Sequence, residues 1–196
     1  MEGKTLIIGI TGGTGCGKTT LLNCIREKGG LVLDCDAIYH QLLTRDTALL
    51  DAIEARFPGV VENGVLQRKK LGNIVFSDSN ALADLNRITH AAVKTEVLHQ
   101  LETAPALAAI DAIGLFEGDL AGLCQVTVAV TAPTEERVRR LMARDNISEE
   151  YARKRIAAQR SSEEFSALCT HTLENHGDIG QFQAKCLAFL SEFGII

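Results

Sequence analysis

The 196-residue sequence has little of what marks several classes of protein. Its six cysteines have neither C-x-x-C spacing nor a cluster with histidines, so it predicts neither a zinc site nor a redox pair. No apolar run approaches the ~18 residues of a membrane span, and no apolar segment with a cleavage site follows the N-terminus. Repeats and low-complexity tracts are missing too. We therefore expect one compact cytoplasmic domain with reduced thiols.

Basic residues are outnumbered by acidic ones, since 20 Lys and Arg against 25 Asp and Glu give a formal net charge of -5. This balance argues against a general nucleic-acid-binding surface. Positive charge is concentrated in one place, because residues 137–160 hold seven arginines and one lysine against three acids. We expect a small-molecule partner, with no nucleic acid or membrane contact, and favour a monomer.

A glycine-rich stretch, residues 12–19, fits the pattern G-x-x-x-x-G-K-[ST]. It follows the apolar run 6–10 and precedes the helix-like segment 21–25, which is the strand, loop and helix order of a P-loop. Its glycines let successive N–H groups turn inward around phosphate oxygens at a helix N-terminus. The sequence therefore predicts a nucleoside triphosphate site, with Lys18 at the β- and γ-phosphates and Thr19 as a Mg²⁺ ligand. The residues expected to bind the nucleotide here are Gly13, Thr14, Gly15, Cys16, Gly17, Lys18, Thr19 and Thr20.

Apolar, strand-like segments alternate with helix-like stretches along the chain. The strand-like segments are residues 5–10, 31–34, 107–112, 126–131 and 171–174. This alternation is typical of a parallel sheet with helices on both faces. The fold class that we predict is α/β, a three-layer arrangement around a five-stranded parallel sheet.

The region 45–104 is larger than a simple crossover between two strands needs, and its pattern is mostly helical. Asp78 or Ser79 can cap a long helix that turns Leu82 and Leu98 inward, among other apolar residues, before a proline ends it. We expect one domain, 1–196, made of a core (1–44, 105–133 and 170–196), a helical acceptor-binding lobe (45–104) and a lid (134–169).

The lid is predicted from its helix signals. A helix follows Pro133 with Thr134 as its cap, the helix breaks at 145–147, and Ser148 caps a second helix. One face of the first helix carries three arginines at spacings of three and four residues: Arg137, Arg140 and Arg144. Such a cluster can neutralise charge on a transferred phosphoryl group, and the alternative is a solvated face paired with carboxylates.

Two carboxylates follow the second predicted strand, at a spacing that places both on one side of its end. We interpret Asp36 as the base that orients an acceptor hydroxyl, and Asp34 as a residue that orders the loop or a Mg²⁺-bound water. The alternative for Asp36 is an N-cap of the helix 37–43. After the third strand, Asp111 is expected at the metal side of the site and Glu117 at the substrate side, unless Glu117 is only exposed at a helix start.

Asp111 also begins a D-x-x-G motif, which after a P-loop is typical of a GTPase switch protein. Such a protein needs an Asn/Thr-Lys-x-Asp segment after the next strand to read guanine, and residues 131–134 do not match it. A kinase is therefore the preferred interpretation. A nucleotide-dependent switch or binding protein without catalysis is the alternative.

Taken in order, these motifs make the chain resemble the dephospho-CoA kinase family. The matching segments are 11–19 (T-G-G-I-G-S-G-K-S in the family), 34–36 (D-A-D), 64–76 (G-x-L-[DQ]-R-x-x-L-x-x-x-V-F), 115–117 (the end of D-x-P-L-L-F-E), 144–159 (R-D…R-x-x-x-Q) and 174–177 (N-x-G). A P-loop alone occurs in many families. The ordered set is specific and spans nearly the whole chain.

The resemblance implies ATP- and Mg²⁺-dependent phosphorylation of the ribose 3′-hydroxyl of dephospho-CoA, by a P-loop kinase fold with a lid and a helical CoA-binding region. It supports Asp36 as the acceptor base and Arg144 as a lid arginine at the phosphates. It also suggests that the adenine of ATP lies near Arg140 and Asn175. The expected catalytic residues are therefore Asp36, Lys18, Arg144 and Arg140.

The chain departs from the family at two points, because residues 113–115 replace Pro-Leu-Leu and residues 90–91 replace His-Pro. Loss of these prolines alters the backbone restriction after the third strand and inside the long helix. His90 therefore has either a packing or surface role or a contact with the substrate. The alternative to a dephospho-CoA kinase is a P-loop kinase for another nucleoside, nucleotide or sugar hydroxyl. The expected acceptor-binding residues are Asp34, Asp36, Glu117 and His90.

Overall fold

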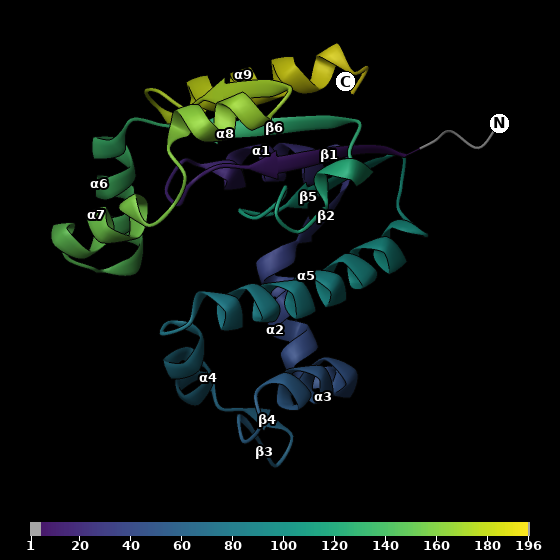
Figure 1. Ribbon diagram of the computed structural model, residues 1–196. Coiled ribbons are helices and arrows are strands. Elements are labelled where there is room, and N and C mark those ends of the chain that lie inside the picture. The colour runs from purple at the N-terminus through teal and green to yellow at the C-terminus, as the bar shows by residue number, and fades with distance from the viewer. Residues whose placement is uncertain (1–4, 196) are drawn as a thin grey trace. The chain divides into compact units, whose positions relative to one another are not determined.

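The computed structural model describes residues 5–195, whose helices and strands are shown in Figure 1. The expected domain limits, residues 1 and 196, lie outside this range. The described residues fold into two compact units. The sheet unit consists of 5–33, Ala104–Leu115 and 121–195, and the helical unit of Asp34–Thr103 and Phe116–Leu120. The helical unit thus starts earlier than the expected lobe and also takes in a short later segment.

Five strands make up the sheet. In order across it they are β2 (Leu31–Asp34), β5 (Leu107–Asp111), β1 (Leu6–Thr11), β6 (Val126–Thr131) and β7 (His171–Glu174). The strands β5, β1, β6 and β7 pair in parallel, with Ile8 opposite both Ala109 and Val126. Every residue of β6 is buried, as expected for a parallel strand covered on both faces. The predicted α/β fold with a five-stranded parallel sheet is confirmed.

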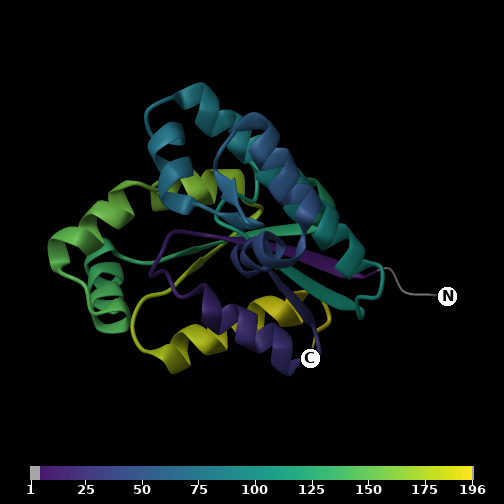
Figure 2. The same cartoon turned by 90° about the horizontal axis from the view of Figure 1, so that it is seen from below.

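Two helices lie side by side on one face of this sheet, α1 (Lys18–Glu27) and α9 (Ile179–Glu192), as Figure 2 shows. Their apolar residues meet those of the central strands in one buried core, which includes Ile8, Leu21, Ile25, Val128, Phe182 and Leu190. Burial of these side chains fixes α1, and with it the loop that connects β1 to α1.

The region 134–169 forms three helices, α6 (Thr134–Asp145), α7 (Glu149–Ala157) and α8 (Ser162–Leu168). Asn146 ends α6 in a left-handed conformation, with φ at 51°, and Ser148 caps α7 by accepting from the Tyr151 N–H. The predicted break and second cap are confirmed. The prediction of Thr134 as a cap is wrong, because Pro133 stands at the N-cap position and Thr134 is the first helical residue.

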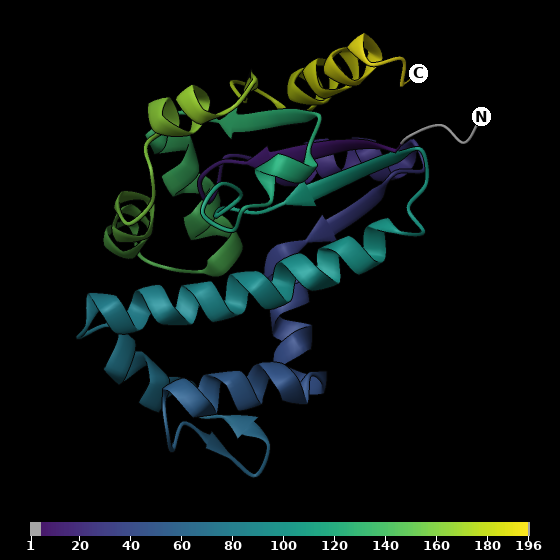
Figure 3. The same cartoon turned by 45° about the vertical axis from the view of Figure 1, so that its right-hand side comes forward.

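The helical unit contains α2 (Cys35–Arg45), α3 (Thr47–Arg56), α4 (Arg68–Val75) and α5 (Ser79–Leu101). The helices α2, α3 and α4 all pack against α5, which runs through the unit in Figure 3. Asp78 caps α5 by accepting from the N–H groups of Asn80 and Ala81, as predicted. Leu82 and Leu98 were expected inward and are 37% and 44% exposed, because the fully buried side of α5 is narrow.

A short hairpin, β3 (Val61–Glu62) and β4 (Val65–Leu66), completes the helical unit and was not predicted. Asn63 and Gly64 form its turn with positive φ angles, 51° and 73°, which is the geometry that an Asn-Gly pair favours. Across the described residues the six cysteines form no disulfide. Among the helices of residues 5–195, none combines the length and the apolar character needed to cross a bilayer.

Candidate active site

The glycine-rich loop between β1 and α1 has the conformation of a closed P-loop. Gly17 adopts a φ of 95° at the N-cap of α1, and a Cβ built there would lie 2.2 Å from Asn175 Nδ2. Only glycine meets both conditions without strain. Lys18 Nζ donates to the Gly12 carbonyl over 2.9 Å and lies 3.9 Å from Asp111 Oδ1. Lys18 thus holds the loop closed while its charge stays beside a carboxylate at the end of β5.

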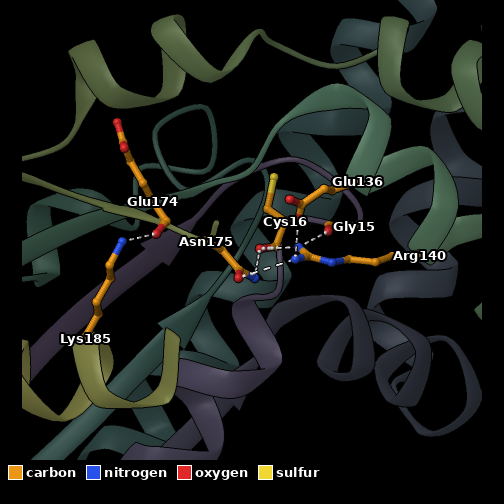
Figure 4. A network of polar contacts seen from close by, with 7 residues as sticks. All are labelled: Gly15, Cys16, Glu136, Arg140, Glu174, Asn175 and Lys185. Carbon is orange, nitrogen blue, oxygen red and sulfur yellow. Dashed lines mark hydrogen bonds and ion pairs between the residues drawn. The ribbon is translucent and has the colours of Figure 1, made fainter. Parts of the chain in front are cut away.

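Side chains from the rest of the sheet unit hold the carbonyl groups of this loop (Figure 4). Arg140 Nη1 donates to the Gly15 carbonyl over 3.2 Å, and Asn175 Nδ2 donates to the Cys16 carbonyl over 2.8 Å. Arg140 Nη2 bonds Glu136 Oε2 at 2.7 Å and Asn175 Oδ1 at 3.4 Å. Because the N–H of a trans peptide points opposite to its C=O, these bonds direct the adjoining N–H groups away from Arg140 and Asn175. The Cys16 N–H donates to the Gly13 carbonyl inside the loop over 3.3 Å, and the Gly17 N–H has the orientation that an anion site in the loop needs.

A second pair of side chains holds the loop at Thr14. Arg137 Nε donates to the Thr14 carbonyl over 2.9 Å, and Gln159 Oε1 accepts from the Thr14 N–H over 2.8 Å. Both side chains come from the region expected to form the lid. Gln159 lies 145 residues from Thr14, so no local sequence signal links them, and only the family pattern singled out Gln159.

The three arginines that the sequence placed on one helix face have three different environments. Arg137 is buried and bonded to Thr14, whereas Arg140 is bonded to Gly15, as described above. Arg144 is 61% exposed and pairs with its neighbour Asp145 at 2.7 Å. Hydrogen bonds from Arg144 and then Arg155 lower the pKa of Asp145 to about 2. Of the three, Arg144 is the most exposed, and its partner is a side chain of its own helix rather than the P-loop.

A cavity of about 300 Å³ adjoins the loop and the N-terminal turn of α1. Its size is at the lower end of the roughly 300–1,000 Å³ of ligand pockets. Ile179 is 76% exposed at this cavity, and Phe182 adds a buried apolar wall. The residues lining it are Gly17, Thr20, Arg139, Arg140, Asn175, Gly177, Ile179 and Phe182. The cavity thus combines apolar surface with the side chain of Asn175, which the family resemblance suggests lies near the adenine of ATP.

Oxygen donors suited to Mg²⁺ are present at the loop. Thr19 is an exposed residue in the first turn of α1, and Asp111 offers a carboxylate near Lys18. Within residues 5–195 no group of three or more His, Cys, Asp or Glu side chains is placed to hold a metal ion. Mg²⁺ is usually held by one or two protein oxygens together with substrate phosphates and water, so this sparse donor set fits it.

In the helical unit, Asp34 is the N-cap of α2 and its Oδ1 accepts from the Ala37 N–H over 3.0 Å. The helix begins at Cys35, so Asp36 lies in its first turn and its side chain is exposed. The alternative interpretation of Asp36 as an N-cap is therefore wrong. Asp34 orders the start of the helix instead, and the carboxylate of Asp36 is not needed for that role.

His90 and Glu117 line the same cavity in the helical unit, which has a volume of about 460 Å³. Lys94 pairs with Asp119 at this cavity, and Ala91 stands where the family has a proline. The remaining lining residues are Ala83, Asn86, Arg87 and Gly118. Hydrogen-bonding and small apolar side chains therefore surround His90 and Glu117, the two residues that the sequence predicts to bind the phosphoryl-acceptor substrate.

Comparisons with known proteins agree on one family. A sequence profile described as dephospho-CoA kinase matches residues 6–181. A dephospho-CoA kinase of Thermus thermophilus is 36% identical over 188 residues, covering 95% of this chain and 91% of the relative. One from Latilactobacillus sakei is 32% identical over 186 residues, covering 92% of each chain. The crystal structure of TT1252 from Thermus thermophilus superimposes with a TM-score of 0.80 at 35% identity, covering 96% of this chain and 97% of the other.

Proposed function

Because the chain belongs to the dephospho-CoA kinase family, we propose that it transfers the γ-phosphoryl group of ATP to the ribose 3′-hydroxyl of dephospho-CoA, giving CoA and ADP. The observation that carries the nucleotide half of the proposal is the closed P-loop, whose carbonyls are held by Arg140 and Asn175. We place the adenine in the 300 Å³ cavity beside this loop, against Ile179. The reaction is expected in the cytoplasm, from a monomer that acts on small molecules.

Catalysis in this proposal depends on position and charge. Lys18 stabilises the β- and γ-phosphates, and Asp36 accepts or orients the proton of the 3′-hydroxyl as it attacks. Arg144, which is 61% exposed, can exchange its partner Asp145 for a phosphate oxygen when the nucleotide is bound. Arg140 supports the phosphates by fixing the loop carbonyls, so we assign it a positioning role. When bound, Mg²⁺ neutralises phosphate charge, and Thr19 and Asp111 are the residues that would hold it.

An Asp36→Asn variant tests the acceptor base. It keeps the size of the side chain and removes the base, so turnover is expected to fall by roughly 10²- to 10⁴-fold while ATP affinity is unchanged. The measurement is ADP release on addition of dephospho-CoA, together with ATP binding by calorimetry. Asp46→Asn is the matched control, because Asp46 is the N-cap of α3 and asparagine caps a helix equally well. Wild-type turnover in Asp36→Asn would remove Asp36 from the mechanism.

A different acceptor is the second candidate, and one observation favours testing it. Ala91 replaces the proline of the family and lines the cavity that also contains His90 and Glu117. Without the proline the backbone of α5 is less restricted at this point, which can alter which acceptor hydroxyl fits the cavity. A panel of nucleosides, nucleotides and sugars in the ADP-release assay separates the candidates. Faster turnover of any of these than of dephospho-CoA would replace the proposed acceptor.

A further inference from the structure

Arg137 is a buried cation to which the proposed mechanism assigns no role. The residue is 3% exposed, although its helix α6 also carries the exposed Arg139 and Arg144. Within residues 5–195, no carboxylate lies within ion-pair distance of its guanidinium. Buried charges in proteins are normally paired, because removing a charge from water costs several kcal/mol per ion. Its counter-charge must therefore come from something other than a protein carboxylate.

The guanidinium lies directly against the P-loop. Its Nε holds the Thr14 carbonyl, whereas its Nη2 is fully enclosed and has no hydrogen-bond partner among the described residues. A Cβ built on Gly13 would lie 2.2 Å from Nη2 and 3.2 Å from Gln159 Oε1. Gly13 therefore lets the guanidinium approach the loop backbone more closely than any other residue would. The unused donor and the charge both lie at the backbone that is shaped to receive phosphates.

The positive charge of Arg137 acts on a residue inside the loop. Burial raises the pKa of the Cys16 thiol, and the positive charges of Arg137 and Lys18 oppose that rise. Cys16 lies between the glycines that shape the loop, so both cations act on the same few residues. Lys18 is the cation that a P-loop motif predicts, and Arg137 adds a second from α6.

We propose that Arg137 is a positioning residue that recognises the negative charge of the nucleotide's phosphates through the backbone of the P-loop, with the bound polyphosphate as its counter-ion. The inference rests on the proposed function only in requiring a nucleotide in the loop. Arg137 then couples α6 to the occupied loop. When the loop is empty, the guanidinium is hydrogen-bonded to Thr14 but its positive charge has no counter-ion. When a triphosphate is bound, its negative charge neutralises the guanidinium across the loop backbone, without direct contact.

The test compares Arg137→Gln and Arg137→Lys with wild type, using inorganic tripolyphosphate as the probe in calorimetry. Gln keeps a donor for the Thr14 carbonyl and removes the charge, so its tripolyphosphate affinity is expected to fall about 10- to 100-fold. Lys keeps the charge and is expected to bind tripolyphosphate clearly more tightly than Gln does. The unfolding midpoint of ligand-free Arg137→Gln should be no lower than that of wild type, because an uncompensated buried charge has been removed.

Arg153→Gln is the matched control, because it removes the same charge from α7, where Arg153 is 42% exposed and pairs with Glu135 and Glu149. Its tripolyphosphate affinity should equal that of wild type. Binding of adenosine, which has no phosphate, should be the same in wild type and Arg137→Gln. Equal tripolyphosphate affinities in wild type and Arg137→Gln, or in the Gln and Lys variants, would overturn this inference alone. No tripolyphosphate binding by wild type would overturn the proposed function as well.

Discussion

The P-loop in the sheet unit and the candidate acceptor cavity in the helical unit differ in how their polar side chains are bonded. In the sheet unit, Arg140 and Asn175 bind main-chain carbonyls of the P-loop, and Asn175 is buried. In the helical unit, Lys94 and Asp119 at the candidate acceptor cavity pair with each other at the surface. Buried bonds fix a loop before a ligand arrives, whereas exposed ion pairs are weak and change partners easily. We therefore expect the proposed nucleotide site to be preorganised and the proposed acceptor site to be adaptable.

Among the variants that test this comparison, the largest effect should come from Lys18, the cation within the loop. Lys18→Met removes the charge that we propose to act on the phosphates, together with the bond to the Gly12 carbonyl, so kcat is expected to fall by roughly 10²- to 10³-fold. Steady-state ADP release measures it. Lys185→Met is the control, since Lys185 only donates to the Glu174 carbonyl from α9 (Figure 4). A Lys18→Met enzyme with wild-type kcat would show that the loop does not hold the reacting phosphates.

The next effect tests whether buried side chains really fix the loop. Asn175→Ala leaves the Cys16 carbonyl and Arg140 each without one partner, so the free energy of unfolding should drop by about 1–3 kcal/mol. The KM for ATP should rise at the same time. Urea unfolding and ATP-dependent kinetics measure the two changes. Asn73→Ala, at an exposed position on α4, should change stability by no more than about 0.5 kcal/mol. Similar losses in both variants would remove the contrast between the units.

A smaller effect should separate stability from nucleotide binding. Asp78→Ala removes the cap of α5 and should lower the free energy of unfolding by about 1 kcal/mol, whereas Asp78→Ser should keep most of it. ATP affinity should be unchanged in both variants, because the cap belongs to the helical unit. Urea unfolding and calorimetry report the two quantities. A parallel loss of ATP affinity in Asp78→Ala would mean that the nucleotide side depends on the order of the helical unit.

The same contrast explains which parts of the molecule the sequence revealed. The P-loop is contiguous, so the spacing of its glycines, Lys18 and Thr19 was enough to locate it. The central strands β1, β5 and β6 were found because their apolar, mostly buried runs need no partner to be recognised. The hairpin at Asn63 and Gly64 carried an available signal that the prediction did not use. Local patterns therefore sufficed for the fold and for the loop itself.

The supports of the loop were harder to predict. The bond between Thr14 and Gln159 joins residues far apart in the chain, and its existence depends on how α6 and α7 pack. Asp34 and Asp36 are both suited to cap a helix, and only the start of α2 at Cys35 decides between them. The sequence shows which polar side chains are present. Burial and packing decide whether each of them binds the backbone, another side chain or a ligand.

The smallest predicted effect concerns a partly exposed ion pair in the sheet unit. Hydrogen bonds from Arg144 and Arg155 lower the pKa of Asp145 from its ordinary 3.8 to about 2. A carboxylate with a lowered folded-state pKa contributes stability above its unfolded pKa and loses it as the pH falls through the folded value. Wild type should therefore lose part of its stability between about pH 4 and pH 2. Asp145→Asn should show a flatter acid limb in unfolding midpoints measured against pH. An identical acid limb would show that Arg144 does not hold Asp145 in solution, and Arg144 would then reach a phosphate without giving up a partner.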